Sequence, residues 1–291
     1  VGPELFYVFL SALEDTGYFN ASLYSPYGIA GVETLGYEIG MQSREQAGKE
    51  PDMVVCTTAG GGMLTGTARG LEKSGCKRTQ AVAASIDLTG LHMASDSQFN
   101  KKSCTTGHTG FGVPHAADPD NADVPRSACR TLRYADLYVT TTQGEVMYMT
   151  EMLANLEGME RGPAGNTALA AAFSLAQELP EEAVIVVSET EYTGAGKHIQ
   201  PQMDFARDNG IDIRFGHPEE DQPGVNLILP EHPGLIRHKE ADIDHFRKSY
   251  IKKALEKAGT GAESLSEADL RFLAEETNSN LDFVKAVLKS I

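Results

Sequence analysis

The chain has 291 residues, of which 41% are hydrophobic and 23% charged, a composition ordinary for a globular protein with one large domain or two smaller ones. Its 25 lysines and arginines against 41 aspartates and glutamates give a formal net charge of −16, which disfavours nucleic acid and anionic membranes as partners. The sequence has no apolar run near the ~20 residues that cross a bilayer, no recognisable signal peptide and no C-x-x-C pair among its four cysteines. We therefore expect a cytoplasmic protein with reduced thiols.

The predicted elements alternate between helix and strand along most of the chain. Helices are predicted at residues 3–17, 28–43, 63–75, 144–158, 165–179 and 197–209, although glycines weaken the helix propensity of the second. Strands are predicted at residues 53–58, 80–87, 135–141, 181–189 and 211–215. The β-branched run in "EEAVIVVSE" predicts a strand in a parallel sheet that is covered on both faces. The alternation as a whole predicts an α/β fold with a mostly parallel sheet covered by helices.

The character of the sequence changes at about residue 242, where polar amphipathic helices replace the alternating pattern. Ser266 lies three residues before Asp269, which is a typical helix N-cap signal. We therefore predict an α/β region at residues 1–240 and a helical C-terminal extension at residues 241–291.

A glycine-rich stretch, "TTAGGGMLTG" at residues 57–66, separates a predicted strand from a predicted helix. Glycines let the backbone approach a ligand closely, and the N–H groups at a helix N-terminus favour an anion. No G-K-[ST] follows, as a P-loop would require, and the dinucleotide pattern G-x-G-x-x-G fails at Thr65. On these residues alone, a structural turn and a phosphate site both stay open.

Four stretches resemble, in the same order, the fold-type II pyridoxal-phosphate (PLP) enzymes, the superfamily of tryptophan synthase β, cysteine synthase and threonine synthase. They are "GVETLGYEI", "VVCTTAGGGMLTGTARGL", "EGMERGPAGNTALAAAFSLA" and "VIVVSETEYTG". The resemblance spans roughly residues 24–215 and looks like the C-terminal two-thirds of that fold. It implies that residues 1–240 form a PLP-binding large domain, and that the protein forms homo-oligomers.

The resemblance also implies which residues bind the cofactor. Main-chain N–H groups would hold the cofactor phosphate at Ala59, Gly60, Gly61, Gly62 and Met63. The family usually has a threonine where this chain has Met63, so we expect that hydroxyl contact to be lost. Ser188 would hydrogen-bond the pyridine nitrogen, and a neutral hydroxyl there suits chemistry at the β-carbon better than transamination.

The sequence also offers candidates for the catalytic residues. The stretch "GHTGFGVP" is similar to a family loop near the substrate, so His108, with His115 next, is the candidate acid/base group, against the simpler interpretation of a surface histidine. The Schiff-base lysine of the family lies upstream of everything matched here. Since Lys197 does not have the matching context, we predict that this lysine is not in this chain, and that it lies on a missing upstream segment or on another chain.

Other reactive groups have simpler interpretations. Cys104, His108 and His92 could suggest a zinc site, but their spacing is a poor match to known zinc patterns, so no metal is expected. Cys104 or Cys129 as an acyl carrier stays open against an inert cysteine. The pair Glu189 and Glu191 is interpreted as a solvated strand end, where the family also has a glutamate.

Two stretches, "GYFNASLYSPYGIAGVETLGYEI" and "SETEYTGAGKHIQPQ", look most like the β-subunit family of 2-amino-4-oxopentanoate thiolases. This resemblance implies a PLP-dependent acyltransferase of ornithine degradation that uses coenzyme A as co-substrate, releases acetyl-CoA and alanine, and has a small α subunit as partner. The coenzyme A thiolate would be the nucleophile. Two alternatives stay open: a β-replacement or elimination enzyme, cysteine synthase- or threonine synthase-like, and a non-catalytic partner subunit that docks through its helical extension.

Overall fold

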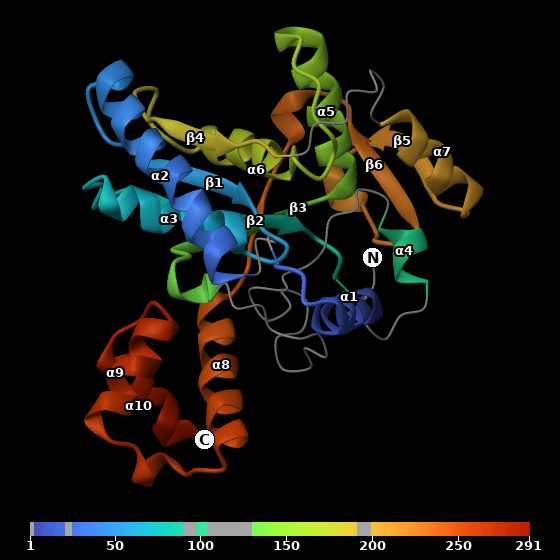
Figure 1. Cartoon of the computed structure of the whole chain (residues 1–291). Coiled ribbons are helices and arrows are strands. Elements are labelled where there is room, and N and C mark those ends of the chain that lie inside the picture. Colours follow the sequence, from blue (N-terminus) through green and yellow to red (C-terminus); the bar gives the residue numbers. More distant parts are fainter. Residues whose placement is uncertain (1–2, 21–24, 90–97, 104–129, 191–198) are drawn as a thin grey trace.

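A five-stranded sheet forms the centre of the α/β region (Figure 1). The computed structural model describes residues 3–20, 25–89, 98–103, 130–190 and 199–291. In spatial order the strands are β4 (Ile185–Ser188), β1 (Met53–Thr57), β2 (Gln80–Ile86), β3 (Leu137–Thr141) and β7 (Lys239–Glu240). Neighbours run parallel except for β7, which is antiparallel to β3. A separate parallel pair consists of β5 (Asp212–Gly216) and β6 (Asn226–Pro230). The predicted α/β fold with a mostly parallel sheet is confirmed.

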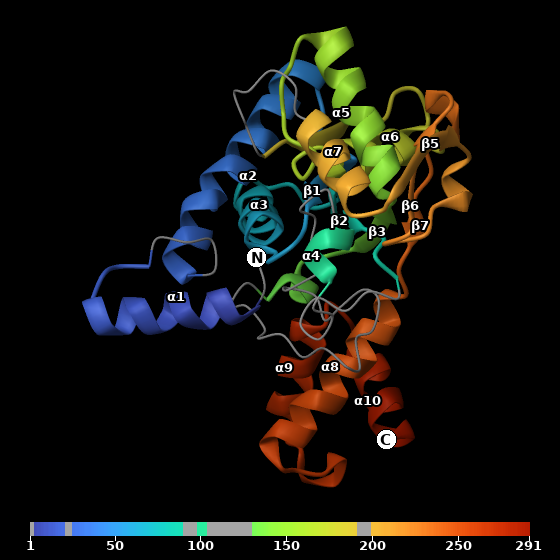
Figure 2. The same ribbon diagram turned by 90° about the vertical axis from the view of Figure 1, so that its right-hand side faces the viewer.

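Helices cover both faces of this sheet. In chain order, the helices of the described residues are α1 (Pro3–Thr16), α2 (Pro26–Ala47), α3 (Gly62–Lys73), α4 (Phe99–Lys102), α5 (Gln143–Glu157), α6 (Thr167–Ala176), α7 (Gln200–Asp208), α8 (Ile243–Ala258), α9 (Glu267–Glu276) and α10 (Leu281–Ser290). Figure 2 shows α2 and α3 on one side of the strands and α5 and α6 on the other. None of the helices in the described part of the chain is long and apolar enough to cross a membrane.

Successive side chains of a strand point to opposite faces of the sheet, so the core has one part on each face. Val54 and Cys56 of β1 pack with Leu64 of α3 on one face. Val55, between them, packs with the alanine-rich surface of α6 on the opposite face. The small side chains of α6 let it lie close to four strands, which brings its N-terminus near the ends of β1 and β4.

Glycines determine how closely α2 and α3 pack. A Cβ on Gly36 would overlap the carbonyl oxygen of Thr67, and a Cβ on Gly70 would overlap the carbonyl oxygen of Glu33. The glycines that weaken the helix propensity of α2 therefore allow its backbone to contact that of α3. This contact helps to hold α3, and hence the glycine-rich turn at its start, against the sheet.

Helices α8 to α10 form a lobe below the sheet in Figures 1 and 2, with a small apolar core of their own. The predicted N-cap is confirmed, since Ser266 and Asp269 form a capping box at the start of α9. Phe246 of α8 packs edge-to-face on Tyr138 of β3, with ring centroids 5.5 Å apart. The division into two domains at residue 240 stays a prediction.

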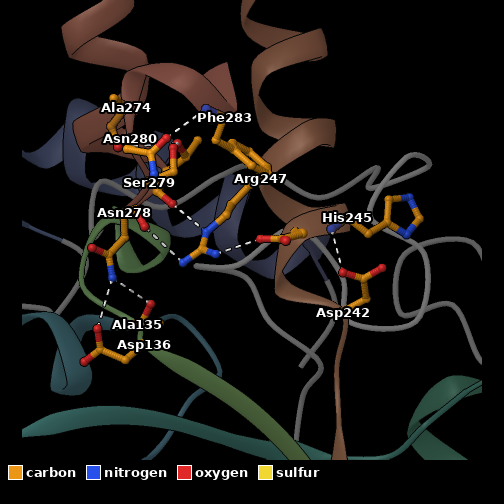
Figure 3. A network of polar contacts seen from close by, with 12 residues as sticks. Ala135, Asp136, Asp242, His245, Arg247, Ala274, Asn278, Ser279, Asn280 and Phe283 are labelled. Atoms are coloured by element: carbon orange, nitrogen blue, oxygen red, sulfur yellow. Dashed lines mark hydrogen bonds and ion pairs between the residues drawn. The ribbon is translucent and has the colours of Figure 1, made fainter. Parts of the chain in front are cut away.

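Polar contacts also connect this lobe to the start of β3 (Figure 3). Arg247 of α8 donates from Nε to the carbonyl oxygen of Thr277 (2.8 Å) and from Nη2 to that of Asn278 (3.0 Å). The side-chain amide of Asn278 in turn donates to the carbonyl oxygen of Ala135 (3.0 Å) and to Asp136 (3.2 Å). The extension is thus hydrogen-bonded to the α/β region as well as packed on it.

Some predicted elements were wrong or missing. The strand predicted to be covered on both faces, β4, is an edge strand in the described sheet and is half-buried over Ile185–Val187. Its β-branched composition favours a strand but does not determine the position of that strand in the sheet. The short strands β6 and β7 were not predicted, and α7 begins at Gln200 rather than at about residue 197.

Candidate functional site

The glycine-rich turn ends at the N-terminus of α3. The N-cap residue, Gly61, has φ 85° and ψ 0°, a left-handed conformation that favours glycine, and none of the described side chains caps the helix. Gly60, Gly61 and Gly62 are buried, whereas Ala59 and Met63 are half-buried. The predicted phosphate-binding residues therefore surround the positive end of a 12-residue helix, which is a favourable place for an anion.

There is no room for a side chain at the centre of this turn. A Cβ on Gly61 would overlap the hydroxyl oxygen of Thr131 and lie 2.7 Å from the Cβ of Thr131. Thr131 belongs to η1 (Thr131–Arg133), a short 3₁₀ helix that directly precedes β3. The turn is thus a closely packed feature whose surface toward a ligand is mainly backbone.

Ser188 is the last residue of β4 and lies beside Cys56 in the parallel register of β1 and β4. Because parallel strands end at the same edge of a sheet, Ser188 and the turn after β1 lie at one edge. Burial raises the pKa of the Cys56 thiol to about 12, although the hydroxyls of Thr67 and Ser188 act in the opposite direction. Cys56 is therefore a protonated, unreactive thiol at neutral pH.

The start of α6 joins the same edge. The hydroxyl of Thr57, at the end of β1, accepts from the N–H of Ala168 and donates to the carbonyl oxygen of Gly165, both at 3.0 Å. Gly165 in turn lies against Thr190, since a Cβ on it would be 3.2 Å from the carbonyl carbon of Thr190. Three of the four stretches that carry the sequence resemblance therefore meet at one place, and only the folded chain brings them together.

The sequence did not predict a buried carboxyl at Glu189, but the structure shows one with a raised pKa. Both of its carboxyl oxygens are buried, and neither has a hydrogen-bond partner within the described residues. Burial raises the pKa of this carboxyl to about 7, and the charge of Arg161 lowers it only in part. The interpretation of Glu189 as a solvated strand end is therefore wrong, because its side chain turns into the protein. A charged residue directly after a strand carries no sequence signal for such burial.

Several predicted residues lie outside the described part of the chain. They are His92, Cys104, His108, His115, Cys129, Glu191 and Lys197. The acid/base role of His108 and the interpretations given to the other residues therefore stay predictions. Within the described ranges, no cluster of histidine, cysteine, aspartate or glutamate residues has the geometry of a metal site.

The family described as "pyridoxal-phosphate dependent enzyme" matches residues 8–191, which is more than half of the chain. The chain belongs to this family. The residues present also fit the PLP cofactor. The helix N-terminus has no side-chain cap among the described residues, the turn before it consists of three glycines, and Ser188 offers a neutral hydroxyl at the same edge.

Two curated relatives of this PLP-family chain are similar over its whole length. A 2-amino-4-ketopentanoate thiolase β subunit from Acetoanaerobium sticklandii is 65% identical, and one from an unknown prokaryotic organism is 58% identical. In both cases the match covers 100% of this chain and 61% of the relative. The chain therefore spans about three-fifths of the length of these relatives.

Solved structures resemble the chain in fold. A hydrogen sulfide-producing enzyme from Fusobacterium nucleatum has a TM-score of 0.51 at 14% identity, covering 69% of this chain and 58% of that one. An O-ureido-L-serine synthase variant has a TM-score of 0.49 at 20% identity, covering 70% and 58%. At such identities the likeness concerns the fold alone.

Proposed function

We propose that this chain is the PLP-binding part of a thiolase β subunit, which cleaves 2-amino-4-oxopentanoate with coenzyme A to acetyl-CoA and alanine. The observation that supports this most is the 65% identity, over the whole chain, to a 2-amino-4-ketopentanoate thiolase β subunit. Two features at one edge of the sheet, the turn at the start of α3 and Ser188, are consistent with it.

The proposed residues would hold the cofactor from two sides. Main-chain N–H groups of residues 59–63 bind its phosphate, and the hydroxyl of Ser188 donates to its pyridine nitrogen. When bound, PLP would supply an electron sink for the electron pair that C3 keeps when the C3–C4 bond breaks. Ser188 is neutral, so it orients the ring without adding a charge.

The proposed reaction balances without an oxidant or reductant. The thiol sulfur of coenzyme A bonds to the ketone carbon C4, the C3–C4 bond breaks, and C3 takes a proton to become the methyl group of alanine. Cys56 is unsuited as the acyl acceptor, because burial raises the pKa of its thiol to about 12. We propose that the acyl group passes directly to coenzyme A. The two cysteines considered as acyl carriers from the sequence, Cys104 and Cys129, lie outside the described residues. His108 stays our candidate for moving the proton.

The remaining components of the enzyme are proposals as well. We place the Schiff-base lysine in a part of the protein outside this sequence, which agrees with a match over only 61% of each curated relative. A small α subunit is the proposed partner, because the relatives are named β subunits, and homo-oligomerisation is expected in addition.

The test is a product assay on the full-length protein with its partner subunit. With 2-amino-4-oxopentanoate and coenzyme A, we expect acetyl-CoA and alanine in equal amounts, and neither product when coenzyme A or PLP is left out. Binding of PLP without any acetyl-CoA would refute the thiolase proposal and leave the fold unaffected. Formation of cysteine from O-acetylserine and sulfide, measured in a parallel assay, would instead favour the β-replacement alternative.

A further inference from the structure

Thr131 carries an unsatisfied hydroxyl at the start of α3. Its side chain is 0% exposed, and its Oγ1 has no hydrogen-bond partner among the residues that the structure describes. The same oxygen occupies the space in which a Cβ on Gly61 would lie. A buried hydroxyl is therefore held against the N-cap residue of α3, and the described residues offer it no acceptor.

This arrangement is costly unless a ligand completes it. A buried hydroxyl without a partner destabilises a protein by at least as much as an ordinary hydrogen bond stabilises it. Such groups are rare in native proteins. At the positive end of α3 the favoured ligand is an anion, which accepts hydrogen bonds and is stabilised by the helix dipole. A threonine hydroxyl can donate to such an anion, whereas the thioether side chain of Met63 cannot.

The C-terminal extension holds Thr131 in this place. Arg130, with φ 54°, and Arg133 both pair with Glu276 of α9, whose side chain is almost fully buried. Arg130 donates from Nε at 2.6 Å and Arg133 from Nη1 at 2.8 Å. The carbonyl oxygen of Thr131 also accepts from the N–H groups of Tyr134 and Ala135, at 2.9 and 3.0 Å. With both flanking arginines and its own carbonyl engaged, Thr131 has little freedom to turn away from Gly61.

We propose that Thr131 is a binding residue for the cofactor phosphate. Its hydroxyl donates to a phosphate oxygen and so supplies, from η1, the side-chain contact that Met63 cannot make. Main-chain N–H groups and one hydroxyl would then bind the phosphate without a lysine or arginine, as suits a chain of net charge −16. The inference rests on the proposed cofactor and adds a residue outside the glycine-rich turn.

The test compares ligands with and without a phosphate. Full-length protein, freed of its cofactor, is titrated with PLP and with pyridoxal, and binding is followed by fluorescence and absorbance. For Thr131→Val, which keeps the shape and removes the hydroxyl, we expect PLP affinity to fall on the order of tenfold, since the lost hydrogen bond is to a charged group. Pyridoxal affinity should stay the same, and Thr131→Ser should restore PLP affinity to within about twofold.

Stability and a matched variant separate binding from folding. Thr131→Val removes an unpaired hydroxyl, so the cofactor-free protein should unfold at the same or a higher temperature, while PLP should raise that temperature less than in the wild type. Thr141→Val is the control: it removes another buried, unpartnered hydroxyl, which lines a cavity of about 390 Å³ at the end of β3, and PLP affinity should not change.

The outcomes distinguish this inference from the proposed function. Equal losses for PLP and pyridoxal in Thr131→Val would overturn the phosphate contact, because a purely structural role would not depend on the phosphate. Unchanged PLP affinity in Thr131→Val, together with a large loss in Gly61→Ala, would overturn it while the cofactor site stands. A wild-type protein that binds no PLP would refute the proposed function and the inference with it.

Discussion

Replacing Gly61 by alanine should destabilise the protein through two effects that the structure separates. The backbone at φ 85° costs an alanine about 1–2 kcal/mol. The new Cβ would also overlap the hydroxyl of Thr131, and relieving such overpacking in a buried place costs about 1–3 kcal/mol. Together we expect about 2–5 kcal/mol, a large part of a typical folding stability of about 5–15 kcal/mol.

Gly75 provides the matched control at the other end of α3. Its φ of 87° is almost the same, but nothing lies within 4 Å of a Cβ placed on it. Gly75→Ala should therefore cost only the backbone contribution of about 1–2 kcal/mol. Thermal unfolding of the cofactor-free protein should show a decrease of roughly 3–8 °C for Gly61→Ala and roughly 2–3 °C for Gly75→Ala.

A double variant tests the steric part directly. Adding Thr131→Ala to Gly61→Ala removes the overlapping oxygen, so it should restore part of the lost stability. Equal decreases for Gly61→Ala and Gly75→Ala, or no recovery in the double variant, would refute the argument that Thr131 fills the space beside Gly61.

Two further predictions concern carboxylates. Burial raises the pKa of Glu189 from 4.5 to about 7 in the folded protein, so between these values the unfolded chain has lost a proton that the folded chain keeps. The free energy of unfolding should therefore fall as pH rises from about 4.5 through 7. The full pKa difference corresponds to roughly 3 kcal/mol. Because Glu189 is partly exposed, we expect Glu189→Gln to remove only about 2 kcal/mol of this pH-dependent loss of stability. Urea unfolding between pH 5 and 8 measures this, and a Glu189→Gln variant with the wild-type pH profile would contradict it. Glu276→Gln should cost about 2–3 kcal/mol, below the 3–5 kcal/mol of a fully buried pair, because Arg130 and Arg133 are partly exposed. Glu275→Gln, which breaks an exposed pair with Arg133, should change stability by less than about 0.5 kcal/mol, and equal effects of the two variants in urea unfolding would argue against a special role for Glu276.

Much of the α/β region was predictable because its signals are local. The strand before the glycine-rich turn, the helix after it and the capping box at Ser266 each depend on a few neighbouring residues, and the structure confirms all three. The exceptions have local causes as well. β7 has only two residues, Lys239 and Glu240, and a pair this short has no detectable periodicity.

Contacts between distant segments were not predictable in the same way. The hydroxyl of Thr131 reaches Gly61 across 70 residues of chain, and Arg130 finds Glu276 across 146. Glu189 was misinterpreted for the same reason, because whether a carboxylate after a strand meets water or protein depends on how distant segments, among them that of Arg161, pack around it. Composition and spacing contain no information on such packing.

By itself, the sequence determined most of the alternating strands and helices, the family and the position of the glycine-rich turn, since periodicity, glycine placement and short motifs depend on neighbouring residues. Only the tertiary structure decided which strand lies at the sheet edge, which carboxyl becomes buried and which hydroxyl faces the start of α3. These properties depend on contacts made when segments far apart in the chain exclude water together, and burial then sets both the cost of an unpaired polar group and its pKa.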